Sequence, residues 1–248
     1  MIGPLALHGG GEFLGGDEPF LRTLLDLAAV SAAARDAAAE TVRVELLTSA
    51  VARHRPEMAF AVGSAALERV AAESRPGLAP IRVRHARVVD AASAADPDLV
   101  ERLAAADLVY LPGGDPDAVL EILAGTATWH AVGRARLRGA VVAGASAGAM
   151  ALGERTWTPD GYVAGLGWAG RLVVVPHASE ARMASMRRAV DALPRGDELA
   201  VLGLPERAGV IGGPGAWTVV GVDGASVWWW PPHAAMARVV PVGTVIGD

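Results

Sequence analysis

The residue that most clearly predicts chemistry is Ser146, in the sequence Gly144-Ala145-Ser146-Ala147-Gly148. The apolar run before it predicts a buried strand, and Ala147 to Leu152 predicts a helix directly after it. A Gly-x-Ser-x-Gly sequence at a strand-to-helix turn is a nucleophile elbow, which lifts the serine hydroxyl above the sheet. The unpaired N–H groups at the start of the helix favour a developing anion. The sequence therefore predicts a serine nucleophile.

Unusual residues also follow other predicted strands. The first strand ends at His8 and is followed by Gly9-Gly10-Gly11, a middle strand is followed by Gly113-Gly114-Asp115, and a later strand is closed by His177. In open α/β sheets, ligands bind at the carboxyl ends of the strands. Paired glycines let backbone N–H groups approach a ligand closely. We therefore expect these segments to share one edge of the sheet with Ser146.

The elements that position these residues alternate along the chain. Strands are predicted at Leu5–His8, Val42–Thr48, Ile81–Val89, Leu108–Leu111 and Leu172–Val175, with helices at Glu18–Ala39, Pro56–Ala72, Asp98–Ala105, Pro116–Leu123 and Ala181–Leu193. This alternation predicts an α/β three-layer sandwich, with a mostly parallel central sheet and helices on both faces. The late strands, joined by glycine-rich turns, are predicted to be antiparallel. With no visible linker, residues 1–248 are expected to form a single domain.

Composition excludes several mechanisms. All 22 basic residues are arginine, so no lysine can form a Schiff base or a Ser-Lys dyad, and there are no cysteines for a thiolate nucleophile or thiolate metal site. The net charge is −5 and the arginines are scattered, so we expect no nucleic-acid partner. No apolar run reaches the roughly 18 residues that span a bilayer. Without a signal-peptide pattern at the start, we expect a cytoplasmic protein with no membrane partner.

Several segments together resemble the serine peptidase family of dipeptidase E and cyanophycinase. They are Leu111-Pro112-Gly113-Gly114-Asp115, Ala145-Ser146-Ala147-Gly148-Ala149, the later His177, the opening Gly9-Gly10-Gly11-Glu12, and Leu202-Gly203-Leu204-Pro205-Glu206. The resemblance spans nearly the whole chain. It implies a class I glutamine-amidotransferase-like fold and a Ser-His-acid hydrolase acting beside aspartyl groups, either in Asp-X dipeptides or in cyanophycin-like isopeptides.

The resemblance also implies roles for individual residues. Ser146 matches the nucleophile, and His177 matches the general base that moves a proton from the hydroxyl to the leaving amine. The oxyanion hole would use the N–H groups of Gly114 and Ala147. Such a mechanism needs no metal and no cofactor, and its partner is a small peptide substrate.

The third member of the triad has two candidates. The resemblance places an acid between the serine and the histidine, where Glu154 and Asp160 stand. We favour Asp160, because it lies in a predicted turn that can swing back towards the histidine more easily than a helix face can. For substrate binding, Asp115 could contact a substrate amine or merely cap a helix. Arg182, with Arg155, could hold a substrate carboxylate in a bidentate fork or be a solvated helix arginine.

Two other interpretations remain open. Gly-x-Ser-x-Gly with a glycine loop is also similar to an α/β-hydrolase esterase, which would pair Ser146 with His233 and with Asp197 or Asp223. The position of the glycine loop after the first strand argues against that fold. The other interpretation is a catalytically inactive relative that binds a ligand in the same cleft.

The run Trp228-Trp229-Trp230 is the remaining unusual feature. Successive residues of a strand face opposite sides, so the three rings cannot share one core. An exposed tryptophan here would indicate a subunit contact, as in a homodimer.

Overall fold

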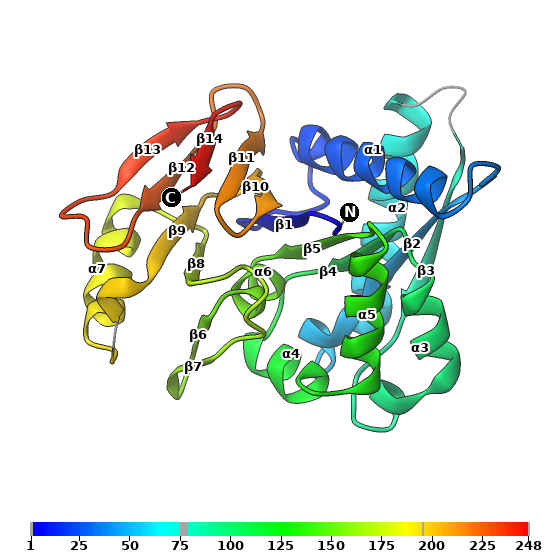
Figure 1. The fold of residues 1–248 in the computed structure, drawn as a ribbon, viewed down its shortest axis with the longest axis horizontal. Coiled ribbons are helices and arrows are strands. Elements are labelled where there is room, and N and C mark those ends of the chain that lie inside the picture. The colour runs from blue at the N-terminus through cyan, green and yellow to red at the C-terminus, as the bar shows by residue number, and fades with distance from the viewer. Residues whose placement is uncertain (1, 75–78, 195, 248) are drawn as a thin grey trace.

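The computed structural model describes residues 2–74, 79–194 and 196–247, which form two sheets with flanking helices (Figure 1). The larger sheet has eight strands and the smaller has six. In spatial order, the larger sheet contains β14 (Val245–Gly247), β11 (Ala216–Gly221), β10 (Ala208–Gly213), β1 (Leu5–His8), β5 (Val141–Ala145), β4 (Leu108–Leu111), β2 (Val42–Leu47) and β3 (Ile81–Ala86). From β1 to β3 all neighbours are parallel, whereas β10, β11 and β14 pair antiparallel.

Helices cover both faces of the larger sheet, as Figure 1 shows. One face packs on α1 (Glu18–Arg35) and α2 (Pro56–Ser74), and the other on α3 (Pro97–Ala104), α4 (Pro116–Leu123), α5 (Ala127–Leu137) and α6 (Ala147–Leu152). Alternation along β5 explains both contacts, since Val141 and Ala143 face α1 and α2 while Val142 faces the opposite layer. Short 3₁₀ turns lie at Thr48–Val51, Ser93–Ala95 and Gly196–Glu198.

The remaining strands form the smaller sheet. Its order is β13 (Arg238–Pro241), β12 (Ser226–Trp230), β9 (Ala200–Leu204), β8 (Leu172–Pro176), β6 (Arg155–Thr158) and β7 (Gly161–Ala164), with α7 (Glu180–Asp191) packed against it. β8 pairs parallel with both β6 and β9, and the other pairs are antiparallel. Trp229 is buried in the main core, while Trp228 and Trp230 are partly buried on the α7 side. The run is therefore divided between the two sides of the strand, as predicted from the alternation of strand residues.

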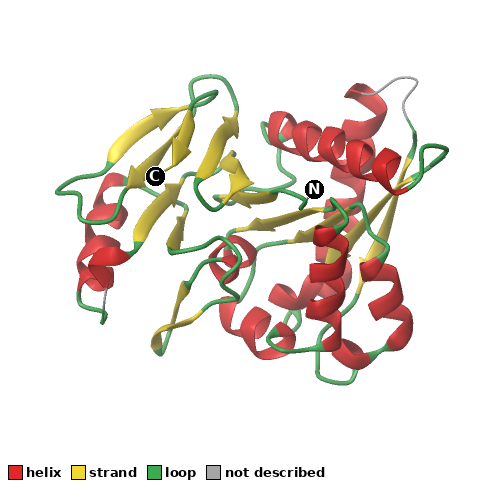
Figure 2. Cartoon of the chain, in the orientation of Figure 1, coloured by secondary structure: helices red, strands yellow, loops and turns green. Residues whose placement is uncertain are grey.

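The predicted fold class is confirmed, but the division into two sheets was not predicted from the sequence. Helix α5, the β6–β7 hairpin, β13 and β14 were not predicted either (Figure 2). In the described part of the chain, none of the helices is both long and apolar enough to cross a membrane.

Candidate active site

Ser146 stands at a sharp turn between β5 and α6. Its backbone angles are φ 46° and ψ −111°, a conformation that a residue other than glycine adopts only at a cost of about 1–3 kcal/mol. The neighbouring glycines are required by space, because a Cβ on Gly148 would meet the carbonyl oxygen of Leu111 at 2.4 Å, and a Cβ on Gly144 would meet the carbonyl carbon of Gly148 at 2.5 Å. Ser146 N–H donates to the carbonyl of His8 at 2.9 Å, which ties the turn to β1. The strand, the turn and the helix have the geometry of a nucleophile elbow.

A chain of two side-chain hydrogen bonds starts at this serine. Ser146 Oγ lies 3.1 Å from Nε2 of His177, and Nδ1 of the same ring lies 3.0 Å from Oε1 of Glu206. The His177 and Glu206 side chains are 41% and 55% exposed, so a substrate can reach the site. Hydroxyl, imidazole and carboxylate in this order are the arrangement of a Ser-His-acid triad.

Neighbouring strands bring His177 and Glu206 together. His177 directly follows β8 and Glu206 comes two residues after β9, and these strands pair parallel with Pro176 opposite Leu204. Glu206 was present in the segment that carried the family resemblance, but the sequence analysis gave it no role. Its position just beyond a strand end was the signal that could have identified it.

The glycine loop after β1 supports this pair. His177 N–H donates to the carbonyl of Gly9 at 2.8 Å, and Arg207 N–H donates to the carbonyl of Gly10 at 3.0 Å. Gly10 has φ +116°, and a Cβ there would lie 2.2 Å from Cε1 of the His177 ring. A side chain at position 10 would therefore displace the imidazole.

The two carboxylates expected to complete the triad lie elsewhere. Asp160 is exposed at the turn of the β6–β7 hairpin, and Glu154 lies just before β6, where its N–H donates to the carbonyl of Leu172 at 2.8 Å. Among the described residues, Glu206 is the carboxylate that hydrogen-bonds to His177. The geometry thus differs from the expectation for Asp160, because a tight hairpin carries that residue outwards instead of back to the histidine.

The Gly113-Gly114-Asp115 loop lies beside the nucleophile. A Cβ on Gly113 would lie 3.2 Å from Ser146 Cβ and 2.6 Å from Glu12 Oε1, and Gly113 N–H donates to that carboxylate oxygen at 2.7 Å. Gly114 has φ +148° and no space for a Cβ, which would meet the carbonyl oxygen of Ala50 at 2.2 Å. Glu12, which the sequence analysis named only as part of a family motif, is therefore a component of the site.

Asp115 has structural partners for both of its carboxylate oxygens. Oδ1 accepts from Asp117 N–H at 3.0 Å at the start of α4, and Oδ2 accepts from Arg53 Nη1 at 2.8 Å. The helix-capping interpretation of Asp115 accounts for the first of these contacts.

The predicted substrate-binding arginines lie on the smaller sheet and its helix. Arg155 is partly buried on β6, and Arg182 is exposed on α7, with its charge close enough to Tyr162 to act on that phenol. Burial dominates there and raises the pKa of Tyr162 to about 12. Neither arginine has a hydrogen bond or ion pair to the triad among the described residues.

Two residues of the esterase interpretation lie in turns that follow β11 and β12. His233 lies in a turn between β12 and β13, and Asp223 lies in an exposed turn between β11 and β12. The side chain of Asp197 is outside the described part of the structure. The imidazole that bonds to Ser146 is that of His177.

A cavity of about 410 Å³ adjoins the nucleophile on its Gly113 side. Its walls are mainly apolar, with three polar side chains, and are formed by Glu12, Phe13, Val51, His54, Arg55, Met58, Ala59, Val62, Pro112 and Gly113. Met58 and Val62 are about half exposed on α2, at 51% and 48%. The size and the apolar walls suit a small organic ligand with a few polar groups.

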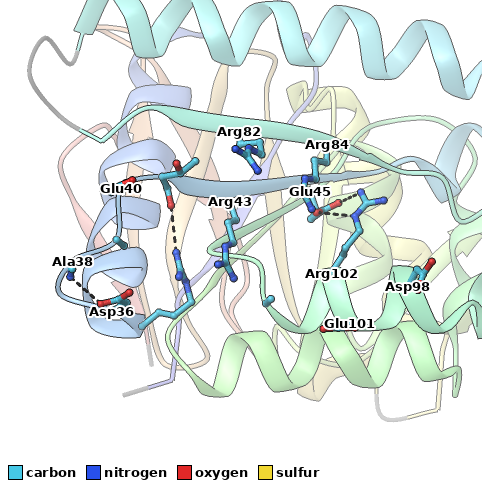
Figure 3. A pocket seen from close by; sticks show the side chains of 14 residues that line it. Asp36, Ala38, Glu40, Arg43, Glu45, Arg82, Arg84, Asp98, Glu101 and Arg102 are labelled. Atoms are coloured by element: carbon cyan, nitrogen blue, oxygen red, sulfur yellow. Dashed lines mark hydrogen bonds and ion pairs between the residues drawn. The ribbon is translucent and has the colours of Figure 1, made fainter.

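A second hollow, of about 690 Å³, lies near the amino ends of β2 and β3, against α3 (Figure 3). Its lining is strongly charged, and Arg102 from α3 holds the buried carboxylate of Glu45 there. Burial raises the pKa of Glu45, and Arg102 opposes that shift. This hollow lies at the amino ends of β2 and β3, whereas Ser146, His177 and Glu206 follow the carboxyl ends of their strands. Among the described residues, no group of three His, Cys, Asp or Glu side chains could hold a metal ion.

Comparisons with known proteins bear on the family and the fold of the chain. The family model of peptidase family S51 matches residues 27–208. The fold is similar to the crystal structure of a peptidase from an acI-B1 Actinobacterium, with a TM-score of 0.78, 23% identity, and coverage of 100% of this chain and 98% of that one. It is also similar to a putative peptidase E protein from Listeria monocytogenes EGD-e, with a TM-score of 0.56, 11% identity, and coverage of 93% and 99%. A search of the curated proteins found no match.

The two structural similarities concern the fold, while the family model covers more than half of the chain and includes both Ser146 and His177. The predicted family is therefore confirmed. The chain belongs to peptidase family S51, a family of serine peptidases that includes dipeptidase E.

Proposed function

We propose that this protein is a serine exopeptidase or dipeptidase that hydrolyses small peptides or isopeptides at aspartyl residues. The observation that carries the proposal is the chain of hydrogen bonds from Ser146 through His177 to Glu206, at 3.1 Å and 3.0 Å. It is supported by the strained backbone of Ser146 at the elbow. We take Glu206 as the acid of the triad.

The catalytic cycle follows from these contacts. His177 Nε2 takes the proton of Ser146 Oγ as the oxygen attacks the substrate carbonyl, and the same proton passes to the leaving amine when the peptide bond breaks. Glu206 accepts a hydrogen bond from His177 Nδ1–H, which fixes the tautomer and stabilises the transient imidazolium. His177 then takes a proton from a water molecule, whose oxygen attacks the acyl carbon. When the bond between the acyl group and Ser146 Oγ breaks, His177 returns this proton to the serine oxygen.

The negative charge on the carbonyl oxygen needs donors close to Ser146. Ala147 is the first residue of α6, so its N–H has no partner within that helix. Glu12 already occupies the N–H of Gly113, and the Gly114 N–H is then the second donor of the proposed oxyanion hole. Removing one such donor typically costs about 10²–10³ in rate.

An aspartyl substrate brings a carboxylate into the cleft, and a buried carboxylate needs a cation. Arg55 lines the cavity beside Gly113, and no other described residue forms an ion pair with it. A guanidinium offers two parallel donors that fit a carboxylate. Arg55 therefore supports the proposed aspartyl specificity more directly than Arg155 or Arg182 does.

The test combines a probe with a substrate panel. A fluorophosphonate should label Ser146, as located by mass spectrometry of the labelled peptide, and Ser146→Ala should remove both labelling and hydrolysis while leaving the fold intact. The same preparations are then given Asp-Leu, Ala-Leu and β-Asp-Arg. Near-wild-type hydrolysis by folded Ser146→Ala would refute the nucleophile, and equal cleavage of Ala-Leu would refute aspartyl specificity.

A further inference from the structure

Glu12 is a carboxylate beside the nucleophile that has no cationic partner among the described residues. The other carboxylates near the site are paired, Glu206 with His177 and Asp115 with Arg53. Glu12 Oε1 is held by Gly113 N–H at 2.7 Å, and that glycine is in turn close to Ser146. Glu12 therefore has acceptor capacity and a negative charge available next to the reacting hydroxyl.

The loop that carries Glu12 is fixed from within the protein. Phe13 N–H donates to Asp17 Oδ2 at 2.9 Å, and the other oxygen of Asp17 lies 3.0 Å from Nε2 of His8, with both side chains fully buried. The Phe13 ring packs on the buried ring of Tyr110, with centroids 5.0 Å apart. Burial, with the charges of Asp17 and Glu12 acting in the same direction, raises the pKa of Tyr110. Side chains held in this way keep a binding group in position before the ligand arrives.

The surroundings of Glu12 favour a cation in the cavity. The carboxylate shares its cavity of about 410 Å³ with apolar groups and with two basic side chains, His54 and Arg55, neither of which forms an ion pair with Glu12 among the described residues. Apolar walls lower the local dielectric constant and strengthen the attraction between opposite charges. When a ligand displaces water from the cavity, the carboxylate needs a partner that is itself positively charged.

We propose that Glu12 binds the α-ammonium group of the substrate's first residue and so requires a free amino terminus. This inference rests on the proposed peptidase function and adds a specificity-determining residue to it. In an N-terminal residue the ammonium nitrogen is separated from the acyl carbon by one carbon atom. The ammonium of an acyl group on Ser146 therefore stays within a few bonds of the serine, and the close approach of Gly113 to both Ser146 and Glu12 puts the Glu12 carboxylate within that range. A lysine or arginine side chain would carry its charge several bonds further away.

The experiment compares free and N-acetylated Asp-Leu with the wild-type enzyme, Glu12→Gln and Glu68→Gln. Glutamine keeps an oxygen for Gly113 N–H but removes the charge, and Glu68 is an exposed carboxylate of α2 that bonds to Ser64. Wild type and Glu68→Gln should cleave the free dipeptide roughly 10- to 100-fold more efficiently than the acetylated one, mainly through KM. Glu12→Gln should lose most of this ratio, while fluorophosphonate labelling of Ser146 shows that the variant keeps a folded active site.

Equal cleavage of free and acetylated Asp-Leu by the wild-type enzyme would overturn the role of Glu12, and this comparison holds even if Glu12→Gln does not fold. An unchanged ratio in labelled Glu12→Gln would overturn it as well. Failure of the peptidase function itself gives a different result, in which Ser146 is not labelled and neither dipeptide is cleaved. A preference for Lys-Leu that depends on Glu12 and persists after N-acetylation would assign the carboxylate to a basic side chain and contradict the proposal.

Discussion

Glu206→Gln is the substitution that tests the proposed triad most directly. Glutamine has nearly the same shape as glutamate and keeps an oxygen that can accept a hydrogen bond from His177 Nδ1–H. In the structure, His177 Nδ1 lies 3.0 Å from Glu206 Oε1. It removes the negative charge that stabilises the imidazolium. The effect on rate should therefore come from electrostatics and from a less firmly fixed tautomer, and the position of the ring should change little.

The magnitude follows from the exposure of the pair. The two side chains are 41% and 55% exposed, so water screens their interaction. Two unit charges about 4 Å apart interact by about 1 kcal/mol in water and by about 4 kcal/mol near a protein surface. At about 1.4 kcal/mol for each factor of ten, kcat/KM should fall roughly 5- to 10³-fold. This is less than the roughly 10⁴-fold effect on kcat of neutralising a buried triad acid.

The assay measures kcat at saturating Asp-Leu and kcat/KM at limiting Asp-Leu. Asp160→Asn and Glu154→Gln, which also remove one carboxylate charge each, are the matched controls. Asp160 is exposed at a hairpin turn and Glu154 lies before β6, so both variants should remain within about twofold of wild type. The reasoning is refuted if Asp160→Asn or Glu154→Gln loses as much activity as Glu206→Gln, or if Glu206→Gln is unimpaired.

Two further predictions concern packing and the remote ion pair. Gly10→Ala should reduce kcat at least about 10²-fold, because its Cβ would lie 2.2 Å from His177 Cε1 and push the ring from Ser146, as kinetics on the folded variant would show. A variant with normal kcat would mean that the ring can move without losing its alignment. Arg102→Ala should destabilise the protein by about 3 kcal/mol at pH 7, because it leaves the buried Glu45 carboxylate unpaired. Burial raises the pKa of Glu45 in the folded state, so the protonated carboxyl group favours folding. The loss of stability in Arg102→Ala should therefore shrink as the pH falls towards 4 and grow as the pH rises through the folded-state pKa of Glu45. Urea denaturation at several pH values measures this loss.

The sequence predicted the parallel part of the larger sheet well, because most of its strands are strongly apolar and end in recognisable residues. β4 and β5 are buried at every position, and the predicted elbow at Ser146 follows β5 directly. The β6–β7 hairpin was missed because its pattern is inverted. Thr156 and Thr158 face inwards at 1% exposure, while Trp157 is 43% exposed, so polar residues occupy the buried side of the strand. Hydrophobic alternation gives the wrong face for such a strand.

The carboxylate that hydrogen-bonds to His177 follows a strand end, which made it a candidate, but the order of residues in the chain does not single it out. Asp160 and Glu154 are close to Ser146 in sequence, but the hairpin and the connection into it keep them from His177. Glu206 is distant in sequence, yet β8 and β9 are parallel neighbours, and parallel neighbours bring the residues after their ends together. Predicting this contact requires knowing which strands pair, and the division into two sheets was not evident from the pattern of strands.

The glycine run after β1 illustrates how a correct location can carry a different role. From the sequence, Gly9-Gly10-Gly11 are expected to bring backbone N–H groups to a ligand. In the structure, the carbonyl of Gly9 accepts a hydrogen bond from His177 N–H, and Gly10 lies against the imidazole ring. A Cβ on Gly11 would lie 3.3 Å from Glu206 Cβ. Ser146 follows a strand of the larger sheet, whereas His177 and Glu206 follow strands of the smaller one. The loop contacts the histidine and the glutamate where the two sheets meet, and small residues allow this close approach. Its glycines thus allow the close packing around His177 and Glu206, and Glu12, which follows them in this loop, lines the cavity of about 410 Å³.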